Sequence, residues 1–80
     1  MTEYRPLSTI AAEIRRDWKK PNYAAVPYLE AMGQLDTIND NFDHDPARQI
    51  VAYFLGNATS WRGETAKRVK AELNKMLKNR

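Results

Sequence analysis

Apolar residues recur at intervals of three and four along most of this 80-residue chain, and this spacing limits the fold more than any other feature. Such a repeat places apolar side chains on one face of an α-helix, whereas a half-buried strand needs alternation. The helical repeat occupies four stretches, at about residues 7–19, 24–35, 46–58 and 61–78. The prediction is therefore an all-α fold, a compact single-domain bundle of four short helices within residues 1–80.

Proline and acidic residues near the ends of these stretches predict where the helices begin. Pro27 suits the first turn of a helix that starts near residue 24, because N–H groups there have no partner within the helix. Asp45 followed by Pro46 predicts an N-cap carboxylate and a first helical residue. Residues 36–45 are rich in Asn and Asp, whose side chains bind nearby backbone in turns. We expect an ordered acidic loop there, with its two large apolar residues, Ile38 and Phe42, turned inward.

The charges fall into three blocks of alternating sign. Residues 1–20 carry five basic and three acidic groups, residues 21–47 carry five acidic groups alone, and residues 48–80 carry eight basic and two acidic groups. The net charges of the blocks are therefore +2, −5 and +6, which give the total of +3. Opposite signs within one small domain predict either pairing across the fold or separate faces for different partners.

Length and composition disfavour several classes of protein. The chain has no cysteine, so it forms no disulfide bond and no thiolate metal site. No apolar run approaches the ~20 residues that span a membrane, and the N-terminal residues lack the apolar core of a signal peptide. We therefore expect a cytoplasmic protein that does not enter a membrane. A chain this short buries only roughly 60% of its unfolded surface, which disfavours a deep enzyme cleft.

Motifs for catalysis and metal binding fail on inspection. Aligned as an EF-hand from Asn39, the acidic loop has His44 in place of the central glycine and Ile50 in place of the last glutamate. No serine lies in a G-x-S-x-G context, and the three glycines form no phosphate-binding loop. We therefore predict no enzymatic activity, no cofactor and no metal.

The stretch "YFLGNATSWRGETAKRVK" has the outline of a helix-turn-helix, which makes nucleic acid a candidate partner. Arg62 and Thr65, however, occupy places where such a motif holds its second helix with Val or Ile. A charged helix face is also most often only solvated. We keep nucleic-acid binding as the alternative, through the basic residues of the last helix, Lys67, Arg68, Lys70, Lys75 and Lys78.

Trp61 and Arg62 lie at the start of the last helical stretch, and their roles depend on which residue caps it. If Gly63 is the N-cap, Arg62 lies in solvent. If Ser60 is the N-cap, Arg62 turns inward and needs a carboxylate, which the acidic loop offers in Asp36, Asp40 and Asp43. Trp61 itself fits a core or rim aromatic better than a platform for stacking bases.

The stretches "AVPYLEAM", "IND", "VAYFLGNA" and "WRGETAKRVKAEL" resemble small orphan proteins encoded by bacteriophages of actinobacteria, and the resemblance spans nearly the whole chain. It implies a phage protein in the cytoplasm of a bacterial host. It carries over no catalytic or binding residue. Short phage proteins outside the virion often bind a host macromolecule, so the resemblance favours a binding role.

Together these features predict a small helical binding module that docks on a host protein. Exposed aromatic residues and arginine dominate interface energies, so the candidate partner-binding residues are Tyr23, Tyr53, Trp61 and Arg62. Nucleic-acid binding through the basic helix face is the first alternative. A self-associating structural protein, which would use an uncovered apolar stripe, is the second. The oligomeric state stays open.

Overall fold

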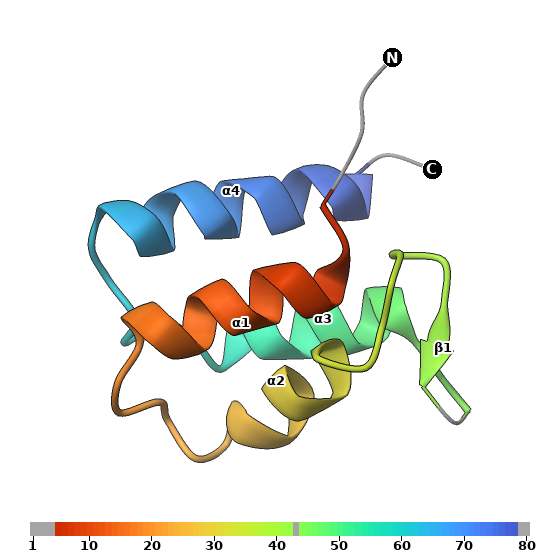
Figure 1. Ribbon diagram of the computed structural model, residues 1–80, viewed down its shortest axis with the longest axis horizontal. Helices are drawn as coiled ribbons and strands as arrows, with labels where there is room; N and C mark the ends of the chain where they lie inside the picture. The colour runs from red at the N-terminus through yellow and green to blue at the C-terminus, as the bar shows by residue number, and fades with distance from the viewer. Residues whose placement is uncertain (1–4, 43, 79–80) are drawn as a thin grey trace.

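The computed structural model describes residues 5–42 and 44–78. Within them the chain forms four α-helices and one two-stranded antiparallel ladder (Figure 1). No helix in these ranges is long and apolar enough to cross a membrane. The prediction of four helices is confirmed, but the fold is mostly helical rather than all-α, because the acidic loop contains two short strands. In chain order the elements are α1 (Leu7–Asp17), α2 (Val26–Met32), β1 (Asn41–Phe42), β2 (Asp45–Pro46), α3 (Ala47–Gly56) and α4 (Glu64–Lys78).

The four helices pack around a shared core in a closed ring, in which each helix contacts two others. α1 contacts α2 and α4, while α3 contacts the same two helices from the other side. Figure 1 shows α4 above α1 and α3, with the short α2 below them. α1 and α4 run antiparallel, so the end of α1 lies beside the start of α4. The domain measures 30 × 29 × 18 Å.

The core takes its residues from the predicted apolar face of every helix. Ile14, Leu29, Phe54 and Leu73, one from each helix, are each at most 1% exposed. Burying a side chain of this size stabilises the fold by ~1.5–3 kcal/mol. Among the described residues, no polar or charged residue is buried. The helical spacing of apolar residues therefore identified the core correctly.

An aromatic cluster closes the core where α1 ends and α4 begins. The rings of Trp18 and Trp61 stack with their centroids 5.8 Å apart and their planes 15° apart. Phe54 meets Trp18 edge to face, at 6.3 Å and 73°. Such pairs contribute ~0.5–1.5 kcal/mol beyond the area that they bury. Trp61 is only 2% exposed, which confirms the expectation that it packs in the core.

The acidic loop is ordered by its own side chains, as predicted. The carboxylate of Asp40 accepts hydrogen bonds from the N–H groups of Asp36 and Thr37, both at 3.0 Å. These backbone hydrogen bonds hold the pKa of Asp40 below its ordinary value, because they stabilise the ionised form. Ile38 and Phe42 are half-buried against the core. The loop therefore uses acidic side chains as backbone acceptors.

The start of α1 is held by the backbone of the segment after α2. The N–H group of Leu7 donates to the carbonyl of Asp36, and that of Ser8 donates to the carbonyl of Leu35, both at 2.9 Å. Pro6 occupies the N-cap position, and its side chain has no hydrogen-bonding group. Tertiary contacts thus satisfy the first N–H groups of α1, in place of a side-chain cap.

α2 begins two residues later than predicted, because a turn occupies residues 23–25. The side-chain oxygen of Asn22 accepts a hydrogen bond from the N–H of Ala24 at 3.2 Å. The carbonyl of Asn22 accepts one from the N–H of Ala25 at 2.8 Å. Pro27 lies in the first turn of α2, as predicted.

The predicted cap of α3 is wrong by one residue. Pro46, rather than Asp45, is the N-cap, with φ −65° and ψ 143°. Asp45 pairs with Phe42 in the β1–β2 ladder instead. The N–H group of Ala47 donates to the carbonyl of Asp40 at 2.8 Å, so the loop backbone does the work expected of the Asp45 carboxylate.

α4 begins three residues later than the predicted start, and Gly63 precedes its first residue. The carbonyl of Gly63 accepts the first helical hydrogen bond, from the N–H of Lys67 at 2.9 Å. Gly63 has φ +117°, a conformation that residues with a Cβ rarely adopt. The cap is therefore Gly63 and not Ser60, and Arg62 lies outside the helix.

Candidate functional site

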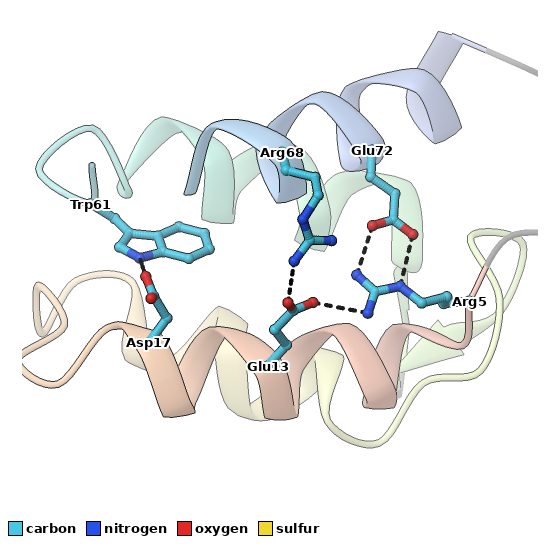
Figure 2. Close-up of polar contacts among 6 residues, drawn as sticks. All are labelled: Arg5, Glu13, Asp17, Trp61, Arg68 and Glu72. Atoms are coloured by element: carbon cyan, nitrogen blue, oxygen red, sulfur yellow. Dashed lines mark hydrogen bonds and ion pairs between the residues drawn. The ribbon is translucent and has the colours of Figure 1, made fainter. Parts of the chain in front are cut away.

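The four predicted partner-binding residues do not form one surface. Tyr23 is 86% exposed and Tyr53 is 48% exposed, so both are open to a partner. Trp61 is buried, and its indole N–H donates to the carboxylate of Asp17 at 2.8 Å (Figure 2). Trp61 is therefore buried in the core and lacks the exposure on which its candidacy as an interface residue depended.

Arg62 lies in solvent, and the idea that it pins the acidic loop is wrong. It forms no ion pair with another described residue. Its neighbours are the basic residues Lys67 and Lys70, with which it surrounds a shallow hollow over Trp61. The glycine cap explains this outcome, because it leaves Arg62 in the connection before the helix. Of the three aspartates offered as partners, Asp43 lies outside the described residues.

The basic residues of α4 divide into two groups. Arg68 pairs with Glu13 of α1, and Lys70 donates from Nζ to the carbonyl of Trp61 at 2.6 Å. Burial, and then the nearby charge of Arg62, lower the pKa of Lys70. Two of the five candidate phosphate contacts therefore have a partner within the chain, although the Arg68 side chain remains 55% exposed. The other three are exposed, namely Lys67, Lys75 and Lys78.

An ion-pair network joins α1 to α4 (Figure 2). The guanidinium of Arg5 donates from Nε and Nη2 to the two carboxylate oxygens of Glu72, at 3.1 and 2.7 Å. Its Nη1 lies 2.8 Å from one oxygen of Glu13. Arg68 contacts the other oxygen of Glu13. The network links the basic first block to acidic Glu72 in the last block, a pairing that the net charges of the blocks did not reveal.

The electrostatics of this network favour its ionised state. The Glu72 hydrogen bond raises the pKa of Arg5 above its ordinary value. The Arg5 hydrogen bond is the largest influence on Glu13, and Arg68 adds to it, so the pKa of Glu13 falls although burial opposes the shift. The Glu13 side chain is 19% exposed. We read the network as a structural clamp, because its charges are neutralised within the chain.

An aromatic pocket of about 300 Å³ lies between α2, α3 and the β1–β2 ladder. The rings of Tyr28 and Tyr53 form a tilted pair in its wall, with centroids 5.5 Å apart and planes at 54°. Gln49 donates from Nε2 to the hydroxyl oxygen of Tyr53 at 2.9 Å. The lining residues are Pro27, Tyr28, Ala31, Phe42, Asp45, Gln49, Ile50 and Tyr53.

Each wall of the pocket comes from a short local pattern. Tyr28 follows Pro27 in the first turn of α2. Gln49 and Tyr53 lie four residues apart on α3, so they share one face of that helix. The ladder brings Phe42 and Asp45 together as a directly paired couple at the mouth. The pocket thus depends on packing between α2 and α3 and on a two-residue ladder.

Only one of the pocket residues, Tyr53, was among the candidates from sequence. Phe42 was expected to turn inward from the acidic loop, and Asp45 was expected to cap a helix. The sequence signal for Tyr53 was its position beside the apolar face of α3, where a large side chain is only half-covered. Tyr28 and Phe42 reach the pocket because α2 and the ladder pack on α3, and the sequence does not specify that packing.

The pocket carries negative charge at its edge. Asp45 is exposed, and it has no ion-pair partner among the residues that the structure describes. The segment that supplies α2 and the ladder, residues 21–47, carries five acidic groups and no lysine or arginine. The electrostatic field at this site therefore favours a cationic ligand.

Across residues 5–42 and 44–78, no three histidine or acidic side chains gather as potential metal ligands. Comparison of the chain with protein-family models, curated proteins and solved structures gave no match. Function is therefore inferred from the geometry and charge of the site.

Proposed function

We propose that this chain is a small helical bundle that docks on a protein partner through the aromatic pocket between α2, α3 and the ladder. The observation that carries the proposal is the open grouping of Tyr28, Phe42 and Tyr53 around one hollow. Aromatic side chains in pockets dominate the binding energy of protein interfaces. Their rings lose little conformational freedom on binding, because few bonds rotate.

The size of the pocket supports a protein ligand. Sites for whole small molecules or cofactors occupy ~300–1,000 Å³, and this pocket lies at the lower limit. Its volume suits one or two anchoring side chains of a larger partner. Asp45 at the edge and the charge of −5 on residues 21–47 select a partner segment that is positively charged beside its apolar anchor.

The helices supply a rigid support for this pocket. α2 packs on α1 and α3, and α3 also packs on α4, so both long walls rest on the core. Ile50 is 4% exposed and connects the pocket floor to that core. A preformed site binds its ligand more tightly, because few side chains and loops lose conformational entropy on association.

Nucleic-acid binding is the second candidate, and one observation favours it. Lys67, Lys75 and Lys78 are exposed and fall on one face of α4, at about 100° per residue. Three phosphate contacts give weak, strongly salt-dependent binding. Titration of a labelled duplex and a labelled single strand at rising salt tests this candidate, and absence of binding at low salt excludes it.

The setting that we propose is the cytoplasm of a bacterial host. Its support is the resemblance of several stretches of the sequence to phage orphan proteins. In that setting the protein partner belongs to the host.

A displayed library of random peptides tests the pocket without knowledge of the partner. Peptides selected on the wild-type protein should bind the Tyr53→Ala variant about tenfold more weakly, because an anchoring ring is lost. Tyr23→Ala is the matched control, since it removes an exposed tyrosine that does not line the pocket. If selected peptides bind both variants equally well, or if none is selected, the proposal is wrong.

A further inference from the structure

The pocket limits the backbone conformation that a partner segment can adopt. A helix laid into a groove needs anchors over several turns, and a hollow of about 300 Å³ does not hold them. Strand addition needs a free edge, but β1 and β2 have only two residues each. A third common mode is a polyproline II segment on aromatic rings, and the paired rings of Tyr28 and Tyr53 in the pocket wall match it.

The polar groups in the wall fit the same backbone. Gln49 already donates to the hydroxyl oxygen of Tyr53, so the hydroxyl hydrogen of Tyr53 is directed to another acceptor. A polyproline II backbone has no internal hydrogen bonds, so its carbonyl groups are free to accept. Proline also lacks an N–H group, so no backbone donor of the ligand is buried without a partner.

The charge at the mouth specifies the flanking residue. Asp45 lines the pocket, and its carboxylate is exposed without a cationic partner among the described residues. An arginine presents two parallel donors to a carboxylate, which gives both attraction and orientation. An arginine beside the proline anchor therefore completes the site.

We infer that the pocket formed by Tyr28, Phe42, Asp45, Gln49 and Tyr53 binds a proline-rich segment in polyproline II conformation that carries an arginine next to the prolines. This inference rests on the proposed function, because it names the ligand class of the same site. Prolines pack on the rings, the Tyr53 hydroxyl donates to a ligand carbonyl, and Asp45 pairs with the arginine.

Three synthetic peptides of about nine residues test the inference by isothermal titration calorimetry. The first has prolines around one arginine, the second replaces the prolines with Gly and Ser, and the third replaces the arginine with glutamate. The first peptide should bind, and the other two should bind about tenfold more weakly. On the protein, Asp45→Asn should weaken the first peptide about threefold, with less effect at high salt. Asp36→Asn, which removes the same charge from the loop outside the pocket, should weaken binding less than Asp45→Asn does.

The outcomes separate this inference from the proposed function. Equal binding of the proline and Gly-Ser peptides would overturn the inference. The inference would also be overturned if an amphipathic helical peptide with the same charge bound more tightly than the proline peptide. If Tyr53→Ala abolished that tighter binding, the pocket would still be a docking site. If none of these synthetic peptides binds but library peptides bind in a way that depends on Tyr53, the inference is wrong and the proposed function still holds. If no library peptide depends on Tyr53, both proposals fail.

Discussion

Arg5 and Glu72 lie 67 residues apart in the sequence and form a two-pronged ion pair, with N–O distances of 3.1 and 2.7 Å. Arg5 also pairs with Glu13, so one guanidinium joins the start of α1, the middle of α1 and the middle of α4. Residues at both ends of the chain thereby hold the two antiparallel helices in register. The contact is polar and partly exposed, so it fixes the arrangement of helices that the apolar core stabilises.

Glu72→Gln should lower the free energy of unfolding by about 1 kcal/mol, a value kept small because the Arg5 side chain is 36% exposed. Urea denaturation followed by circular dichroism measures the change. Glu64→Gln is the matched control in the same helix, because Glu64 is exposed and forms no ion pair with a described residue. It should lose only a few tenths of a kcal/mol, from the helix dipole. Equal losses in both variants would show that the pair does not stabilise the fold.

The low pKa of Glu13 gives the network a pH dependence of known sign. Glu13 binds its proton less readily in the folded state than in the unfolded state, where its pKa has the ordinary value of 4.5. Its stabilising contribution is therefore complete above pH 4.5 and is lost as the pH falls through the lower folded pKa. Thermal melts from pH 7 to pH 3 should show a shallower loss of Tm for Glu13→Gln than for the wild type. Parallel curves would contradict the assignment.

Trp61 should affect stability rather than partner binding. Trp61→Phe removes the hydrogen bond to Asp17 and part of the stack on Trp18, and should cost about 2 kcal/mol. Asp17→Ala leaves the indole N–H without that acceptor and should cost about 1 kcal/mol. The double variant should lose less stability than the sum of the two single-variant losses, because both substitutions remove the same hydrogen bond. Fully additive losses in urea denaturation would indicate that the bond is absent in solution.

Gly63 and Gly56 offer a matched test of the α4 cap. A Cβ added at either position meets no atom within 4 Å, so crowding is equal, but only Gly63 has a positive φ, of 117°. Gly63→Ala should destabilise the fold by about 1 kcal/mol or more, whereas Gly56→Ala should stabilise it by about 0.5 kcal/mol. A Gly63→Ala variant as stable as the wild type would show that α4 does not begin through this glycine.

The sequence predicted the helices and the core because both depend on the spacing of apolar residues. Ile14, Leu29, Phe54 and Leu73 lie one in each of the four predicted helical stretches, and all are buried. The errors concern helix ends, and at the start of α3 a hydrogen bond to the loop backbone replaced the predicted side-chain cap. The carbonyl of Asp40, for example, took the role expected of the Asp45 side chain at the start of α3.

The candidate site was less predictable, because its walls meet only through packing. Tyr53 was identified as a candidate by residue type, but Tyr28 and Phe42 come from elements whose contact with α3 no local pattern specifies. Trp61 was grouped with exposed aromatics because exposure is invisible in sequence. Arg62 lies in solvent, in the connection before Gly63 and α4.

Nuclear magnetic resonance of the ¹⁵N-labelled protein tests the central claim, that the aromatic pocket is the docking site, most directly. Titration with the arginine-containing proline peptide should shift the amide signals of pocket residues such as Tyr28, Phe42 and Tyr53, and in Tyr53→Ala the same shifts should need about tenfold more peptide. The exposed basic face of α4, at Lys67, Lys75 and Lys78, should remain unchanged. Shifts confined to α4, or an unchanged midpoint of the titration in Tyr53→Ala, would contradict the claim.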